Sequence, residues 1–256
     1  MISFISGAAK DLYVLLVHNF FRFRVFFSTV DRSTFEVFDK GIFIKKSLID
    51  KKSAEILKLA IDEILEKDVL VWESGDHSDA RIYGFESVFD FSKVDLDIDS
   101  IRRYGETYLG NKLRYFIAVA GRLTAVDGNL GSGGGWHRDS PFRHQFKVII
   151  YLSDVKSDRG PFQYILESHK FKEKVRFSGL GSDATRFSED FVNGLPIKKC
   201  HEVTGSIGDA IFVDTKGIHR GKPIKSGSRY AITFYFFERL PSGHISKLTQ
   251  RGATIL

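Results

Sequence analysis

Residues 128–152 read GNLGSGGGWHRDSPFRHQFKVIIYL, and this stretch decides the fold. Five glycines within 128–135 predict a flexible loop, because clustered glycines interrupt regular structure. The apolar run 146–152 predicts a buried strand. In an extended segment, residues two apart point to the same side. His137 and Asp139, which lie between loop and strand, could therefore present an imidazole and a carboxylate to one metal ion.

Further apolar segments on both sides of this stretch predict a chain rich in short strands. Residues 41–45 are strand-like, and after a candidate N-cap at Ser47 the apolar residues of 48–67 recur at helical spacing. A second helix is expected over 98–109, and most of 73–100 is expected to be loop. Short strands that follow initial helices favour a mainly β domain, a sandwich or barrel with helical cover. The other predicted strands are 113–120, 122–126, 162–166, 197–203, 210–213 and 230–237.

Composition narrows the function classes. The chain has 256 residues, of which 43% are hydrophobic and 27% charged, as expected for one globular domain with additions. Its single cysteine, Cys200, excludes an internal disulfide and a cysteine-ligated zinc site, and fits a reducing compartment. Any metal must therefore be held by histidine and carboxylate. No segment reaches the roughly 20 uncharged apolar residues that span a bilayer, so we expect a cytoplasmic protein.

The positive charge is concentrated near the C-terminus. The net charge is +6, and residues 216–256 contain eight Lys or Arg and one Glu. Arg220, Lys222 and Lys225 closely follow a candidate ligand at His219, so we expect them to attract a small anion at the mouth of a pocket. Arg138 and Arg143 are expected to contribute to the same positive potential. A nucleic-acid surface is the second interpretation of this charge, and we expect no nucleic-acid partner.

Residues 1–35 form a Phe-rich extension that we separate from a single domain over 36–256. The segment 12–27 is apolar at first and then interleaves phenylalanine with Arg22 and Arg24. One interpretation is a basic amphipathic segment on a membrane surface, which would make the protein membrane-associated. The other is an element that covers the core, its arginines flanking a buried aromatic face. Both stay open at this point.

Two His-x-Asp pairs are candidates for the metal site. One is His77 with Asp79, in a polar loop with no clear strand after it. The other is His137 with Asp139, between the glycine loop and a strong strand. Because a short pattern of this kind arises readily by chance, its context decides, and the context favours the second pair.

A third ligand and a carboxylate-binding residue follow in the last part of the chain. His219 comes after the predicted strand 210–213, and Arg229 opens the next strand. Two histidines and one carboxylate leave three positions of octahedral Fe(II) open, which suits a chelating keto acid and O2. An arginine fork suits the distal carboxylate of that keto acid.

Together these motifs resemble the phytanoyl-CoA dioxygenase family of Fe(II)/2-oxoglutarate-dependent oxygenases. The resemblance covers about residues 38–237. One departure is Leu166-Glu167, where the family usually has Pro-Gly, and it affects a turn rather than a ligand. The motifs that carry the resemblance are 41–45, His137-Arg138-Asp139, 147–154, 160–170, Gly208-Asp209, His219 and Arg229.

The resemblance implies a double-stranded β-helix core, the jelly-roll fold of the cupins. It also implies Fe(II) as the metal, 2-oxoglutarate as cosubstrate and O2 as oxidant. Tyr151 shares a strand face with one of the implied site residues and is expected in the pocket wall. The implied iron ligands are His137, Asp139 and His219, and the implied cosubstrate contacts are Arg229, Thr124 and Lys147.

The expected activity is hydroxylation of a small, anionic metabolite with release of succinate and CO2. The carboxylate of Asp139 leaves no ligand position for a halide, so hydroxylation is favoured over halogenation. Residues 177–194 interrupt the strands and could form a lid. The alternative is a jelly-roll protein that binds metal without 2-oxoglutarate or has no catalytic activity.

Overall fold

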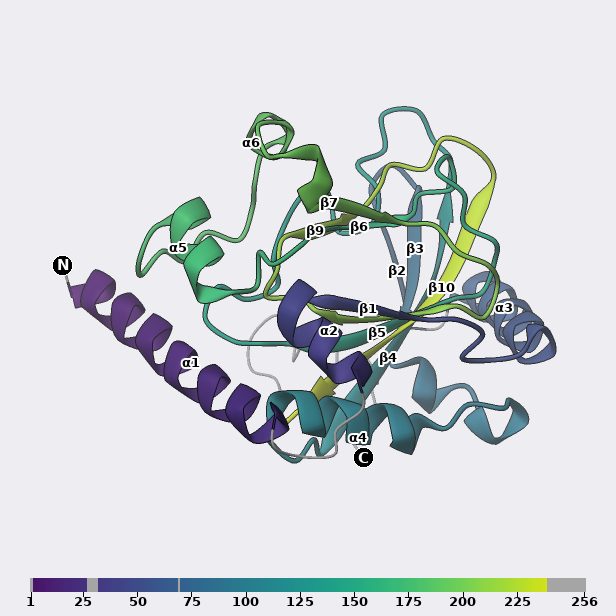
Figure 1. The fold of residues 1–256 in the computed structure, drawn as a ribbon. Coiled ribbons are helices and arrows are strands. Elements are labelled where there is room, and N and C mark those ends of the chain that lie inside the picture. The colour runs from purple at the N-terminus through teal and green to yellow at the C-terminus, as the bar shows by residue number, and fades with distance from the viewer. Residues whose placement is uncertain (1, 27–31, 69, 239–256) are drawn as a thin grey trace.

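The computed structural model describes residues 2–26, 32–68 and 70–238. Its centre is a larger and a smaller antiparallel sheet that face each other (Figure 1). This is the jelly-roll architecture that the resemblance implies. Within the described residues, the strands are β1 (Ile42–Lys45), β2 (Val71–Glu73), β3 (Asp79–Tyr83), β4 (Tyr115–Thr124), β5 (Phe146–Tyr151), β6 (Phe162–Ile165), β7 (Cys200–Val203), β8 (Ala210–Asp214), β9 (His219–Gly221) and β10 (Ser228–Phe237).

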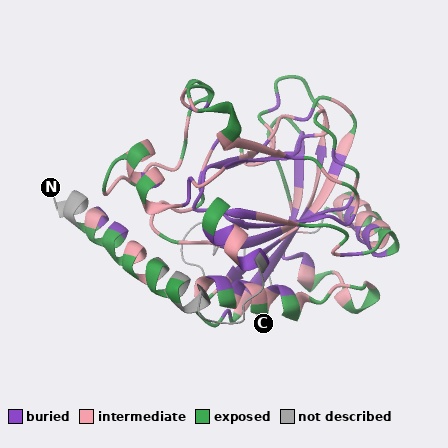
Figure 2. Ribbon diagram, in the orientation of Figure 1, coloured by how far each residue is buried: buried purple, intermediate pink, exposed green. Residues whose placement is uncertain are grey.

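The strand order explains how distant segments meet. The larger sheet has the order β1-β8-β5-β10-β4-β3-β2, and the smaller one has the order β7-β6-β9. Helices lie outside this pair of sheets, with their exposed faces turned to solvent (Figure 2). They are α1 (Ile2–Phe26), α2 (Arg32–Lys40), α3 (Lys51–Glu66), α4 (Ile98–Leu109), α5 (Phe171–Ser178) and α6 (Glu189–Asn193).

The two faces of the larger sheet differ in chemistry because side chains alternate along each strand. On β10, Ile232 and Phe234 are fully buried in the main hydrophobic core, which α3 and α4 complete from outside. Their neighbours Thr233 and Tyr235 line a cavity on the other side of the sheet. Burying apolar side chains yields about 25 cal/mol per Å², so the outer face stabilises the fold and the inner face is available for function.

Several predicted elements are confirmed, and others need correction. The helix over 98–109 is α4, while 113–120 and 122–126 are one strand, β4. Helix α3 begins at Lys51 rather than 48, because Asp50 is its N-cap and accepts a hydrogen bond from the N–H of Ser53 at 2.6 Å. Ser47 instead has a positive φ of 51° and lies in a turn.

The expectation of loop over most of 73–100 is wrong for β3. This strand reads Asp-Ala-Arg-Ile-Tyr, and because two of its residues are charged, the alternation of its two faces was not recognised as a strand pattern. The alternation exists, but one face meets a polar cavity rather than the apolar core, because Asp79 and Arg81 line the cavity while Ile82 is fully buried. Helices α2 and α5 were likewise not expected.

The N-terminal extension is mostly one helix, α1, which lies along the outside of the molecule (Figure 1). It is anchored by Asp11, whose Oδ2 lies 2.5 Å from Nζ of Lys174 in α5, both side chains being buried. Leu12, Tyr13 and Leu16 are 54%, 67% and 63% exposed. Among the described residues, no helix is long and apolar enough to cross a membrane. Contact of 12–27 with a membrane surface stays a prediction, with residue 27 outside the described part.

Candidate metal centre

Backbone pairing brings the two predicted histidine ligands together. The N–H of His137 donates to the carbonyl of His219 at 2.9 Å, and the N–H of His219 donates back at 2.8 Å. Two residues on, the N–H of Asp139 donates to the carbonyl of Thr215 at 3.0 Å. The loop before β5 is thus held beside the segment that leads into β9, although the histidines are 82 positions apart (219 − 137).

Each imidazole is oriented by a backbone carbonyl. Nδ1 of His137 lies 2.9 Å from the carbonyl oxygen of Gly135, and Nδ1 of His219 lies 2.9 Å from that of Gly217. Since a carbonyl can only accept, each Nδ1 carries the proton and each Nε2 keeps its lone pair. This is the arrangement by which proteins fix the orientation of histidine ligands.

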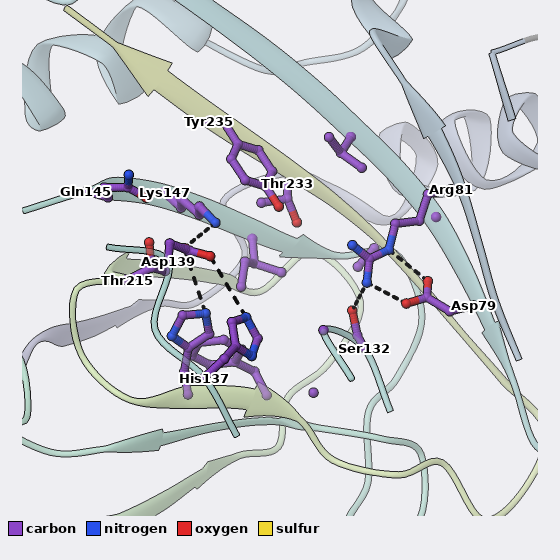
Figure 3. A pocket seen from close by; sticks show the side chains of 18 of the residues that line it. Asp79, Arg81, Ser132, His137, Asp139, Gln145, Lys147, Thr215, Thr233 and Tyr235 are labelled. Carbon is purple, nitrogen blue, oxygen red and sulfur yellow. Dashed lines mark hydrogen bonds and ion pairs between the residues drawn. The ribbon is translucent and has the colours of Figure 1, made fainter. Parts of the chain in front are cut away.

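The three predicted ligands form one cluster, with ligand atoms that all lie within 4.8 Å of one another. Nε2 of His137 is 3.9 Å from Oδ1 of Asp139, and Nε2 of His219 is 3.9 Å from Oδ2. Figure 3 shows the ring of His137 beside the carboxylate of Asp139. Two imidazole nitrogens and one carboxylate oxygen on one side of a cavity suit a divalent transition-metal ion, so the donor set fits the implied metal.

The electrostatics keep these groups in the forms that ligate metals. Burial lowers the pKa of His137, and burial together with the nearby His137 lowers the pKa of His219 to about 3. Desolvation acts to raise the pKa of Asp139, but Lys147 and the two histidines outweigh it, so that this pKa lies below its ordinary value. Near neutral pH the cluster therefore consists of two neutral imidazoles and a carboxylate.

Lys147 lines the cavity as expected, but the contact that the structure gives it is to a predicted ligand. Its Nζ lies 2.5 Å from Oδ2 of Asp139 and 4.0 Å from the ring centroid of Tyr235. The charge of Asp139 raises the pKa of Lys147 against the opposing effect of burial, so the side chain is a cation.

Arg229 also lines the cavity, whereas Thr124 does not. Arg229 is 7% exposed; its Nη1 donates to the carbonyl of Gly160, and its Nε has no hydrogen-bond partner in the described part of the chain. The prediction for Thr124 is wrong because side chains alternate on β4. Leu123 lies on the cavity side of that strand, so its neighbour Thr124 points away.

The cavity has a volume of about 660 Å³ and lies between the two sheets and the glycine loop. Arg81 forms a two-pronged pair with Asp79, and its Nη2 also donates to Ser132 of the loop at 2.9 Å. Sequence reasoning missed this group. The His77 and Asp79 pattern did point to it, yet His77 is exposed and contacts Glu73, so only the aspartate reaches the cavity. Tyr151 lines the wall as predicted.

Of the basic residues that the sequence indicated for the pocket mouth, only Arg143 lines the cavity; Arg138 is buried elsewhere. Arg220 pairs with Glu189 and Lys222 pairs with Glu202, and neither lines the cavity; Lys225 does not line it either. Arg143 and Arg186 do line it. The part of the basic run 216–256 beyond residue 238 lies outside the described residues.

The comparisons with known proteins agree with this geometry. The phytanoyl-CoA dioxygenase (PhyH) family model matches residues 114–231, which include all three clustered residues and Arg229. A search of curated proteins found no significant match.

Solved structures share the fold at low sequence identity. The epimerase SnoN, in complex with Fe3+, alpha ketoglutarate and nogalamycin RO, aligns with a TM-score of 0.63 at 16% identity, covering 85% of this chain and 88% of that one. The non-heme alpha ketoglutarate dependent carbocyclase SnoK aligns with a TM-score of 0.60 at 16% identity, covering 86% of this chain and 91% of that one. EvdO2 from Micromonospora carbonacea var. aurantiaca, complexed with 2-oxoglutarate, aligns with a TM-score of 0.58 at 15% identity, covering 82% of this chain and 91% of that one. These alignments show the jelly-roll fold, and the match over 114–231 makes this part of the chain similar to the phytanoyl-CoA dioxygenase family.

Proposed function

We propose that this protein is an Fe(II)- and 2-oxoglutarate-dependent dioxygenase that hydroxylates a small anionic metabolite. The observation that carries the proposal is the convergence of His137, Asp139 and His219 on one side of a cavity that also contains Arg229. No fourth His, Cys, Asp or Glu joins the cluster in the described residues. A metal held there would keep positions for a chelating cosubstrate and O2.

Arg229 supports 2-oxoglutarate as the cosubstrate. A buried guanidinium with an unpaired Nε is costly unless an anion approaches it. The distal carboxylate of 2-oxoglutarate supplies such an anion and can accept two parallel hydrogen bonds from the fork. The ligand set would hold the metal while Arg229 orients the keto acid toward it.

The charge of the cavity supports an anionic substrate. Five cations line it, and the two carboxylates among its lining residues are already paired, Asp79 with Arg81 and Asp139 with Lys147. With Arg229 assigned to the cosubstrate, Arg143 and Arg186 remain to attract a carboxylate or phosphate.

The bound Fe(II) would supply the activation of O2, so that one oxygen atom enters a substrate C–H bond as a hydroxyl group and the other enters succinate as CO2 leaves. The protein would contribute geometry. His137, Asp139 and His219 would hold the metal on one side of the cavity, and Arg229 would hold the distal end of the keto acid.

The test loads the protein with Fe(II) and 2-oxoglutarate without oxygen, adds carboxylates, phosphate esters, CoA thioesters and nucleotide sugars separately, and then admits O2. We expect succinate above the substrate-free level with at least one anion, and a product heavier by one oxygen atom. Metal-free protein is the control. Absence of iron-dependent succinate with or without substrate would instead support the non-catalytic alternative. Turnover that does not need 2-oxoglutarate would support a different metalloenzyme.

A further inference from the structure

The two oxygens of Asp139 have different surroundings. Oδ2 forms an ion pair with Nζ of Lys147 at 2.5 Å. In the described part of the chain Oδ1 has no hydrogen-bond donor, and it lies 3.9 Å from Nε2 of His137. An ion pair of this length neutralises its oxygen, so Oδ1 is the oxygen available to a metal.

The aromatic ring of Tyr235 holds Lys147 in place. Its Nζ lies over the ring of Tyr235 at 4.0 Å from the centroid, and the two residues are direct partners in the pairing of β5 with β10. The side chain is 7% exposed. An ammonium over an aromatic face and against a carboxylate has little freedom to turn elsewhere (Figure 3).

The register separates Lys147 from the proposed carboxylate-binding end. Its partner Tyr235 and Arg229 are six residues apart on β10 (235 − 229), which is about 20 Å along a strand. The two cations are therefore poorly placed to share the distal carboxylate of one 2-oxoglutarate molecule. Lys147 acts at the metal end of the cavity.

We propose that Lys147 is a positioning residue that keeps Asp139 a one-oxygen ligand and thereby keeps three metal positions open. This inference rests on the proposed function. Without the ammonium, both oxygens of Asp139 would be available to the metal, and two-oxygen ligation would occupy a fourth position of an octahedral ion. The metal would then bind at least as tightly, while 2-oxoglutarate would compete with the carboxylate for the remaining positions.

The test uses Lys147→Met, which keeps length but removes the charge, and Lys147→Arg, which keeps the charge. Co(II) serves as the probe because its visible absorption reports coordination number. Titration of each full-length variant gives the Co(II) dissociation constant, and titration of the Co(II)-loaded protein gives that of 2-oxoglutarate. Lys156→Met, at an exposed position, is the matched control.

For Lys147→Met we expect Co(II) affinity equal to or above that of the unmodified protein and 2-oxoglutarate affinity about tenfold lower. The cobalt spectrum should shift toward higher coordination before 2-oxoglutarate is added. Lys147→Arg should restore most of the 2-oxoglutarate affinity. Loss of both affinities together, or of neither, would overturn the inference.

A second variant covers the case in which Lys147→Met does not fold. Tyr235→Leu removes the ring that contacts the ammonium and does not alter the three ligands or Lys147. As with Lys147→Met, Co(II) affinity should stay equal or rise and 2-oxoglutarate affinity should fall, but by a smaller factor. Equal changes in both affinities would count against the inference. If the unmodified Co(II)-loaded protein does not bind 2-oxoglutarate, the proposed function fails; if it binds and Lys147→Met behaves identically, only the inference fails.

Discussion

A side chain at Gly133 would collide with His137. A Cβ atom built on this glycine lies 2.3 Å from Cε1 of the imidazole, well inside contact distance. Gly133 also has a φ of 88°, a conformation that side chains rarely adopt. The glycine loop therefore does more than connect β4 and β5, because the absence of a side chain at this position leaves room for the histidine ring.

The first prediction separates the steric effect of a side chain on His137 from the backbone strain of a positive φ. Gly133→Ala should weaken metal binding by roughly tenfold, because the methyl group displaces His137 from its orientation. Gly135→Ala is the matched control: its φ is 89°, but a Cβ there meets nothing within 4 Å. Co(II) titration of both variants checks the expectation. Equal loss in the two variants would mean that backbone strain alone is responsible.

The second prediction concerns Arg229. Removing a charged hydrogen-bond partner costs about 2–3 kcal/mol, so Arg229→Ala should weaken 2-oxoglutarate binding to the metal-loaded protein on the order of 100-fold. Metal affinity should not change. Pyruvate, a keto acid without a distal carboxylate, is the control ligand, and its weak affinity should be the same in both proteins. A parallel loss of pyruvate binding would indicate that Arg229 holds the cavity open rather than pairing with the cosubstrate.

The third prediction concerns the attachment of α1. Asp11 is buried, and its Oδ2 also accepts from the N–H of Gly181 at 2.9 Å, so the contact joins α1 to two segments of the domain. Asp11→Ala should lower the free energy of unfolding by about 3–5 kcal/mol, because it leaves the ammonium of Lys174 buried without its ion-pair partner. The double variant with Lys174→Met should recover part of this loss. Urea denaturation measures both, and no difference between single and double variants would argue against a coupled pair.

The fourth prediction concerns acid stability. Burial lowers the pKa of His169 to about 4, and its Nε2 lies 3.0 Å from the carbonyl oxygen of Phe38. Between about pH 6.5 and pH 4 the unfolded chain binds a proton that the folded side chain excludes. The free energy of unfolding should therefore fall as the pH is lowered through this window, by on the order of 3 kcal/mol in total.

Urea denaturation at pH 7 and pH 5 tests this, since most carboxylates titrate below that range. Burial raises the pKa of Glu86 to about 7, so a matched variant that retains Glu86 is needed for comparison. His169→Gln retains a donor toward Phe38 and cannot titrate, so its stability should depend less on pH. An unchanged pH dependence in this variant would assign the effect to other histidines, such as His219, whose pKa is lowered as well.

Local patterns in the sequence predicted much of the molecule. Helix α4 has the predicted bounds because the apolar spacing and the flanking residues Asp97 and Gly110 are local signals. The selection of His137 over His77 also needed only the neighbouring glycine loop and strand. Strand β3 was missed because the residues on its inner face are polar, and local hydrophobicity cannot distinguish a polar cavity wall from a loop.

The sequence by itself determined which residue types could bind a metal and a keto acid, since His137, Asp139, His219 and Arg229 stand at recognisable places relative to predicted strands. Only the tertiary structure decided which other side chains face them. Thr124 points away and Asp79 points in because strand register sets the side of the sheet. Lys147 meets Asp139 for a similar reason: the loop and β5 are folded against each other by backbone bonds to distant segments, and contacts of that kind leave no local pattern in the chain.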